Sequence, residues 1–261
     1  MAQAVVFFDL DGTLFQDDKT VAPATQVALN QLVANGNQPV IAAGRDLWEI
    51  RALMMATGIS NAIAGNGATI VAHNQVIERH HIDHALTVAI SQRCAADGLV
   101  AAWYNEDGAV LSGLDGLSRA NYADVHQALP PVQPDYYLRA EPTRMLIFVP
   151  NNAAGRRITA RYRALFPQMS FYHDSPYDID LIETRLSKES GVNAMLARPE
   201  FAGATSYAFG DGDNDIPMAR RVDHPVAMAN ASAELKACAE FTTRSNMAGG
   251  IEFALQHYQL I

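Results

Sequence analysis

The stretch "AVVFFDLDGTLF", residues 4–15, places two acidic residues directly after an apolar run. The run Val5–Phe8 predicts a strand that is buried on both faces. Asp9 and Asp11 then follow two residues apart, with a glycine and a threonine behind them. Aspartate and glycine are common turn residues, so a simple turn at the end of a strand fits these letters. A catalytic pair of carboxylates at the mouth of a sheet fits them too, and the rest of the chain distinguishes the two interpretations.

The length and composition indicate an acidic globular protein with a large core. The chain has 261 residues, of which 49% are hydrophobic, and a formal net charge of -9 at pH 7. This length allows one large domain or two smaller ones. The acidic balance disfavours nucleic acid and anionic membranes as partners, because both require a basic face on the protein.

The N-terminal residues and the cysteine content predict a cytoplasmic protein. The start of the chain lacks the basic residues and the small-residue cleavage site of a signal peptide. No apolar run approaches the roughly 20 residues that a membrane-spanning helix needs. The two cysteines, Cys94 and Cys238, lie far apart in a long chain, which is typical of a reducing compartment.

Strands alternate with helices towards both ends of the chain, whereas the middle contains hairpin signals. We expect strands, with helices between them, at 5–8, 39–43, 62–64, 206–209 and 225–229. Such alternation is typical of a parallel sheet with crossover helices. The pairs Asp107-Gly108 and Ser175-Pro176 instead predict turns between antiparallel strands. We therefore expect an α/β core domain formed by residues 1–81 and 185–261, with an α+β domain inserted at 82–184.

Four polar or glycine-rich segments each follow a strand of the expected parallel sheet. They are Asp9–Thr13, Ala43–Arg45, Gly65–Gly67 and Gly210–Asp215. Ligands of open α/β sheets bind at the carboxyl ends of the strands, so the acids should gather along one edge. Clustered carboxylates need a hard divalent cation, and Mg²⁺ suits a site that also holds a phosphate. The glycines let backbone N–H groups approach an anion, and Lys188 adds a positive charge, so the pattern indicates phosphoryl transfer.

The ordered set of motifs resembles the haloacid dehalogenase superfamily, and in particular the Cof-type phosphatases with a large inserted cap of the C2B type. The resemblance covers essentially the whole chain. The residues that carry it are Asp9-Leu10-Asp11-Gly12-Thr13, Gly44-Arg45, Asn66-Gly67-Ala68, Ser187-Lys188, Gly210-Asp211, Asn214-Asp215, the segment "VAMANA", Ser245-Asn246 and Gly249-Gly250-Ile251. It implies a Rossmann-like parallel-sheet core with an inserted α+β cap.

The resemblance also implies the roles of the acids. Asp9 would be the nucleophile that forms an aspartyl-phosphate, and Asp11 would protonate the leaving group and then activate water. Mg²⁺ would be held by Asp9, by the backbone carbonyl of Asp11 and by Asp211. Asp215 would support this metal shell from behind.

The remaining motif residues would bind the substrate. Lys188 and Asn214 would contact the phosphoryl group, and the backbone N–H groups of Ala43 and Gly44 would also be available to it. Two further contacts to the substrate are expected, from Arg45 and Asn66. The inserted cap would close over the site and select the leaving group.

We therefore expect a Mg²⁺-dependent phosphatase that acts on a small phosphorylated metabolite, a sugar phosphate. One alternative is a phosphosugar mutase, although the mutases insert residues into the motif that is the compact "GDGDND" here. The other alternative is a weakly catalytic or non-catalytic protein that binds a phosphorylated metabolite. Ala43 suggests it, because the family usually has Thr or Ser at this position.

Overall fold

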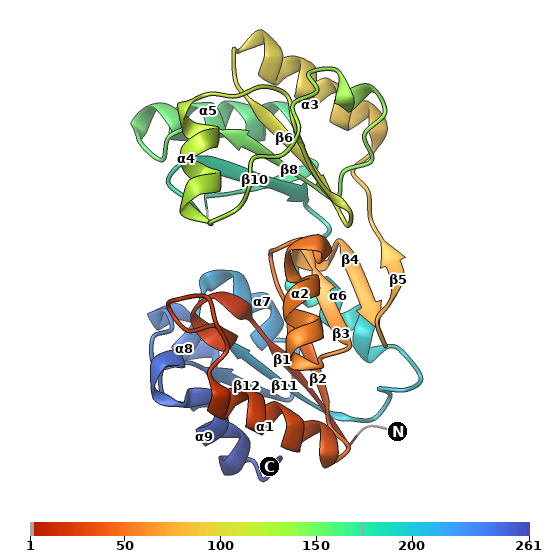
Figure 1. Ribbon diagram of the computed structural model, residues 1–261, viewed down its shortest axis with the longest axis vertical. Helices are drawn as coiled ribbons and strands as arrows, with labels where there is room; N and C mark the ends of the chain where they lie inside the picture. Colours follow the sequence, from red (N-terminus) through yellow and green to blue (C-terminus); the bar gives the residue numbers. More distant parts are fainter. Residues whose placement is uncertain (1–2, 174) are drawn as a thin grey trace. The chain divides into compact units, whose positions relative to one another are not determined.

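Two β-sheets lie in two compact units of the chain. The structure is a computed structural model and describes residues 3–173 and 175–261. The first unit contains the residues up to Arg45 together with Ile50–Glu78 and Leu186–Ile261. The second unit contains Asp46–Glu49 and Arg79–Arg185. The first sheet of Figure 1 is therefore built from two separate stretches of the chain, one before and one after the segment that forms the second sheet.

The first unit is built around an eight-stranded sheet with the order β13-β12-β11-β1-β2-β3-β4-β5. Its strands are β1 (Ala4–Phe8), β2 (Gln38–Ala42), β3 (Asn61–Ala64), β4 (Thr69–Ala72), β5 (Gln75–Arg79), β11 (Thr205–Gly210), β12 (His224–Ala227) and β13 (Phe241–Thr242). The six strands from β13 to β3 pair in parallel. This arrangement confirms the predicted α/β fold with a parallel core, and β1 lies at its centre between β11 and β2.

Helices cover both faces of this sheet. They are α1 (Pro23–Ala34), α2 (Leu47–Thr57), α6 (Lys188–Leu196), α7 (Ile216–Ala219), α8 (Ala233–Cys238) and α9 (Gly250–His257). Val192 and Met195 of α6 and Met218 of α7 pack against Val5 and Phe7 of the central strand. Figure 1 shows α1 on the opposite side of the sheet from α6. The central strands are therefore buried on both faces, as their continuous apolar runs predict.

The edge of the sheet beyond β3 departs from the parallel pattern. β4 runs antiparallel to β3, with Ile63 opposite Ile70, and β5 lies next to β4. His73 and Asn74 connect β4 to β5 with φ angles of 51° and 63°. Two consecutive left-handed residues form the tight turn that suits the twist of a two-stranded hairpin. The sequence analysis predicted no strands in this segment, because a His-Asn turn is a weaker signal than Asn-Gly.

The second unit contains a five-stranded antiparallel sheet with the order β7-β6-β8-β10-β9. Its strands are β6 (Ala101–Asn105), β7 (Gly108–Leu111), β8 (Arg144–Phe148), β9 (Met169–Tyr172) and β10 (Asp178–Glu183), and its helices are α3 (His84–Ala96), α4 (Gly116–Asp124) and α5 (Ala153–Leu165). The predicted turns after Glu106 and near Pro176 do connect antiparallel strands. The apolar core of this unit includes Trp103, Met145 and Leu181.

A buried arginine explains why Asp46–Glu49 belongs to the second unit. The Arg144 guanidinium contacts Asp46 at 2.8 Å, Glu49 at 2.8 Å and Asp180 at 3.2 Å. It also lies 4.4 Å from the ring centre of Tyr104. Burial raises the pKa of Asp46 to about 6, although Arg144 opposes that rise. Ion pairs with Arg144 therefore attach the start of α2 to the unit that contains β8 and β10.

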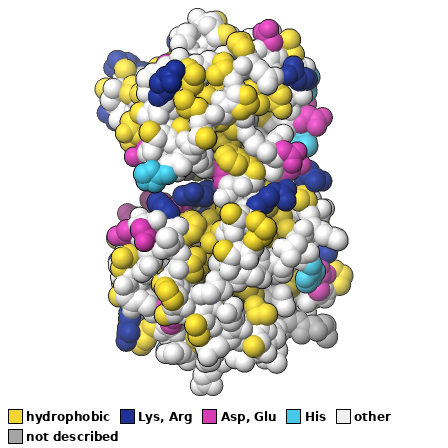
Figure 2. Space-filling view, in the orientation of Figure 1, with side chains coloured by type: hydrophobic (Ala, Val, Ile, Leu, Met, Phe, Trp, Pro, Cys, Tyr) yellow, Lys and Arg dark blue, Asp and Glu magenta, His cyan; other side chains and the backbone are white. Residues whose placement is uncertain are grey.

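The surface mixes charged and apolar side chains. On the face shown in Figure 2, Lys and Arg side chains stand among Asp and Glu, and hydrophobic side chains lie between them. Within residues 3–173 and 175–261, no helix has both the length and the apolar character needed to cross a bilayer.

We predict that residues 82–184 fold when produced alone. The apolar cluster from Ile82 to Leu181 lies within this range, whereas Trp48, from outside it, packs on a second cluster around Tyr104. The fragment should show a cooperative thermal transition by circular dichroism and dispersed amide resonances in NMR spectra, because an apolar core of this kind stabilises a domain of about 100 residues. A gradual, non-cooperative transition would show that the insertion depends on the rest of the chain.

Candidate active site

Three carboxylates meet at the carboxyl end of the central strands. Asp9 directly follows β1, and Asp211 directly follows β11. The two strands pair in parallel with Phe8 opposite Phe209, so both end at the same level. Asp215 lies four residues beyond Asp211, and each of the three acids offers an oxygen within 4.8 Å of the others. The structure therefore brings together three of the four acids that the resemblance implies for the metal site, namely Asp9, Asp211 and Asp215.

A buried lysine neutralises part of this charge. The Lys188 ammonium donates hydrogen bonds to Oδ1 of Asp9 and, at 2.6 Å, to Oδ1 of Asp215. Its side chain has no exposed surface. Burial alone would lower the pKa of Lys188, but Asp215 and Asp9 raise it instead. The lysine is therefore a fixed positive charge at the site.

One lysine does not balance three acids. Burial raises the pKa of Asp9 to about 8, and the nearby Asp215 and Asp211 add to that rise while Lys188 opposes it. Burial and Asp215 also raise the pKa of Asp211. The cluster by itself consequently favours holding a proton, which a bound cation would displace.

Asp215 organises the loop that carries Asp211. Its Oδ2 accepts hydrogen bonds from the backbone N–H groups of Asp211, at 3.0 Å, and Gly212, at 3.1 Å. Its other oxygen accepts from Lys188. Asp215 thus supports Asp211 and Lys188, and its support of a metal shell stays a prediction. Asn214, the expected phosphoryl contact, lies exposed on the same loop, and its role stays a prediction.

The turn after Asp9 depends on a glycine. Gly12 has a φ of 80°, and a Cβ at this position would overlap the carboxylate of Asp211. The turn is closed by the Leu14 N–H, which donates to the Asp9 carbonyl at 3.1 Å. The Thr13 hydroxyl donates to Asp211 at 3.2 Å. Gly12 is therefore required both for the left-handed backbone and for the room beside Asp211.

The Asp11 carboxylate has different hydrogen-bond donors from the Asp9 carboxylate. Its two carboxylate oxygens accept hydrogen bonds from Arg45 Nε at 2.9 Å and Arg45 Nη2 at 2.8 Å. The Lys19 ammonium contacts Oδ1 at 2.8 Å. Burial would raise the pKa of Asp11, but hydrogen bonds and charge from Arg45 and Lys19 hold it below its usual value. The substrate-free site therefore keeps Asp11 ionised.

The loops after β2 and β3 are hydrogen-bonded to each other. The Asn66 N–H donates to the Ala43 carbonyl at 2.9 Å, and the Gly65 N–H donates to the Arg45 carbonyl at 2.8 Å. Asn66 has a φ of 53°, and its amide lies beside Gly44. One expectation is wrong: the Ala43 N–H already donates to the Ile63 carbonyl at 2.8 Å and is not free for a phosphate. Ala43 directly follows β2, and its N–H continues the parallel hydrogen bonding between β2 and β3.

Sequence reasoning missed two residues that contact the site. Lys19 lies in the turn beyond the first motif and reaches back to Asp11. Asn230, in the segment "VAMANA", donates to the Gly12 carbonyl at 2.8 Å. The motif similarity of "VAMANA" was a signal for Asn230, but no local pattern shows which residue its amide contacts.

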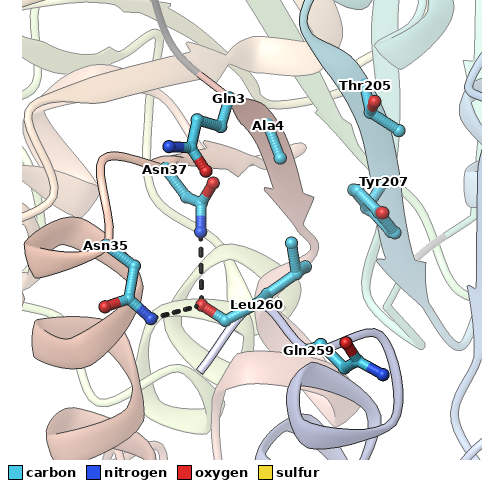
Figure 3. Close-up of a pocket in the computed structure, with 8 residues that line it drawn as sticks. All are labelled: Gln3, Ala4, Asn35, Asn37, Thr205, Tyr207, Gln259 and Leu260. Carbon is cyan, nitrogen blue, oxygen red and sulfur yellow. Dashed lines mark hydrogen bonds between the residues drawn. The ribbon is translucent and has the colours of Figure 1, made fainter.

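One cavity of the first unit lies away from these acids. It has a volume of about 430 Å³ and includes Ala4 and Thr205, the first residues of β1 and β11. Figure 3 shows its neutral lining, in which the amides of Asn35 and Asn37 donate to the Leu260 carbonyl at 3.0 and 3.2 Å. It lacks the carboxylates and the ammonium group found at the other end of the strands, so it does not resemble a phosphoryl-transfer site.

Comparison with known proteins assigns the family. A family model described as haloacid dehalogenase-like hydrolase matches residues 6–255, and the chain belongs to this family. It is 27% identical over 270 residues to the protein named "Putative phosphatase YkrA" of Bacillus subtilis (strain 168), with 100% of both chains covered. The family and this relative confirm the expectation of a phosphatase.

Solved structures share the fold over the whole chain. A crystal structure of a protein from Geobacillus kaustophilus HTA426 has a TM-score of 0.91 and 28% identity, and each chain is covered in full. The structure titled as the subclass IIB sugar phosphatase BT4131 of the same superfamily has a TM-score of 0.83 and 24% identity, covering 99% of this chain and 100% of that one. The chain therefore shares the fold of these structures, and its family and relatives make it a haloacid dehalogenase-like phosphatase.

We predict that Lys188→Met lowers the free energy of unfolding by about 3 kcal/mol at pH 7 without divalent metal, because it leaves Asp9 and Asp215 buried without their cation. The measurement is urea unfolding. Lys236→Met is the matched control, since that amine donates to the Ala229 carbonyl at the surface. The loss should shrink at lower pH, where Asp9 holds a proton and no longer needs the cation. Equal stability of the Lys188→Met variant and the wild type would contradict the charge balance described for this site.

Proposed function

We propose that this phosphatase is Mg²⁺-dependent and hydrolyses a small phosphorylated metabolite, a sugar phosphate, through an aspartyl-phosphate at Asp9. The observation that carries the proposal is the contact of Asp9 with the fully buried Lys188, beside a second acid, Asp211. A nucleophile, a fixed cation and a metal-binding acid at one strand edge are the parts that phosphoryl transfer requires.

The residues present fit a magnesium ion. Hard cations prefer carboxylate oxygens, and Asp9 and Asp211 offer them within 4.8 Å of each other. The absence of a Cβ at Gly12 leaves open the space next to Asp211. Asp9, Asp211 and the backbone carbonyl of Asp11 would hold the ion, with Asp215 behind them. When bound, Mg²⁺ supplies a positive charge that stabilises the phosphoryl oxygens.

The chain's own residues then account for each transfer of electrons and protons. An Asp9 oxygen attacks phosphorus and forms a new P–O bond while the ester P–O bond breaks. The ester oxygen leaves with that electron pair and takes a proton from Asp11. In the second half, Asp11 accepts a proton from water, whose oxygen attacks phosphorus and releases Asp9. Lys188 stays charged throughout and offsets the negative charge on Asp9 and the phosphoryl group.

The substrate class rests on the site and on relatives. Arg45 and Asn66 lie at the strand edge beside Asp11 and Gly44, and we assign them to substrate contacts. One solved structure of the same fold is titled a sugar phosphatase. Relatives are named as phosphatases, which favours hydrolysis over the mutase and over a purely binding protein.

We predict that Asp9→Asn abolishes phosphate release while the fold is retained. An amide fills the same volume but does not act as the nucleophile, and it also removes one of three crowded negative charges. Phosphate release should be measured over a panel of sugar phosphates with Mg²⁺, and BeF₃⁻ should bind the wild type alone. Asp213→Asn is the control, because Asp213 is an exposed acid of the same loop. Activity above a few per cent in Asp9→Asn would rule out the covalent mechanism.

We predict that Mg²⁺ binds more tightly as the pH rises towards 8. The pKa of Asp9 is raised to about 8, so below this pH a proton competes with the cation and must leave when Mg²⁺ binds. The apparent dissociation constant should fall by about tenfold per pH unit between pH 6 and 8 if one proton is displaced. Isothermal titration calorimetry in buffers of different ionisation enthalpy measures both quantities. Affinity independent of pH in this window would show that Asp9 is already ionised.

A further inference from the structure

A short hairpin, residues 16–20, follows the nucleophile turn (Asp9–Leu14). It contains a residue with strained backbone, Lys19. The Gln16 N–H donates to the Thr20 carbonyl at 2.8 Å, and the Lys19 N–H donates to the Gln16 carbonyl at 3.0 Å. Asp18 accepts hydrogen bonds from both the N–H and the hydroxyl of Thr20. Lys19 adopts a φ of 63°. Left-handed backbone is unfavourable for a lysine, so the rest of the hairpin must hold it there.

The strained conformation brings the Lys19 ammonium onto Asp11. The distance from Nζ to Oδ1 of Asp11 is 2.8 Å, and Arg45 Nη2 contacts the same oxygen at 2.8 Å. The Lys19 side chain is 55% exposed, and exposed ion pairs of this kind stabilise a fold very little. Folding stability therefore does not explain why a lysine occupies a strained position, whereas a role at the acid does.

The hairpin is also fixed to the core. The Asn246 amide donates to the Phe15 carbonyl at 3.0 Å and to Asp17 at 3.3 Å. The Asn246 N–H in turn donates to Asn230, which contacts the nucleophile turn through the Gly12 carbonyl. Lys19 thus extends from a supported turn.

We infer that Lys19 is a positioning residue that aims the Asp11 carboxyl group at the leaving oxygen. The inference rests on the proposed function. Arg45 is assigned there to the substrate, so it cannot orient Asp11 alone once a phosphate has arrived. Lys19 is the second cation on the acid, and it keeps Asp11 in place while the ester oxygen leaves phosphorus with its electron pair and takes the Asp11 proton.

Two esters separate this role from simple phosphate binding. Glucose 6-phosphate, or glycerol 3-phosphate where the hexose is a poor substrate, has an alkoxide leaving group that needs protonation. p-Nitrophenyl phosphate releases a stable phenolate that does not. The ratio kcat/KM reports the steps up to the first irreversible one, which is transfer to Asp9, and it excludes the later hydrolysis that both esters share.

Lys19→Asn tests the inference with little effect on the turn, because asparagine tolerates left-handed backbone and is too short to reach Asp11. We expect kcat/KM for the alkyl ester to fall by about tenfold, which is part of the 10²–10⁴-fold that a general acid contributes. For p-nitrophenyl phosphate the fall should be less than about twofold. Lys19→Arg should recover most of the alkyl activity, and both variants should unfold at the wild-type temperature.

Arg157→Gln is the control for the loss of one charge, because it removes an exposed cation of α5. This variant should leave kcat/KM unchanged for both esters. An equal fall on both esters in Lys19→Asn, or a Lys19→Arg variant that behaves like Lys19→Asn, would overturn the positioning role while the phosphatase mechanism stands. A wild type that releases phosphate from neither ester, or an active Asp9→Asn, would overturn the proposed function and this inference with it.

Discussion

The contact between Lys188 and the acids at the end of β1 is the interaction on which the site depends. Three carboxylates in a buried edge would repel one another, and their desolvation alone is costly. Lys188 reduces both penalties by donating to Asp9 and Asp215 at once. It leaves the cluster short of positive charge, which is what a site for a cation and a phosphoryl group requires.

The capping of α6 and its tight packing on β3 hold this lysine beside the acids. Lys188 is the first residue of α6, and the preceding Ser187 caps the helix by accepting from the Ser190 N–H at 3.2 Å. One turn later, Gly191 packs so tightly on Ile63 of β3 that a Cβ would overlap that side chain. The start of α6 therefore lies against the strand edge. Packing therefore fixes the position of α6, and Lys188, the first residue of this helix, supplies the positive charge.

The sequence predicts the parts of the site that follow local rules. Asp9 and Asp211 come directly after apolar runs, and parallel strands end together, so their meeting could be expected before the structure was known. The contacts made by Lys19 and Asn230 could not, because they depend on the rotamers and turns of distant segments. Asn230 lies 218 positions from Gly12. The hairpin of β4 and β5 was missed because its turn lacks glycine, and the bond from the Ala43 N–H was missed because strand pairing decides where donors are used.

The two acids of the first motif have opposite electrostatic environments, although only Leu10 separates them. Burial among other carboxylates raises the pKa of Asp9, whereas Arg45 and Lys19 lower that of Asp11. A nucleophile must be ionised and a general acid must be protonated, so the substrate-free state has the reverse of the charges that the proposed reaction needs. The ligands themselves would correct this. A divalent cation lowers the pKa of Asp9, and an arriving phosphate dianion raises that of Asp11 while it competes for Arg45. The working protonation state of the proposed reaction would then be favoured when both are bound.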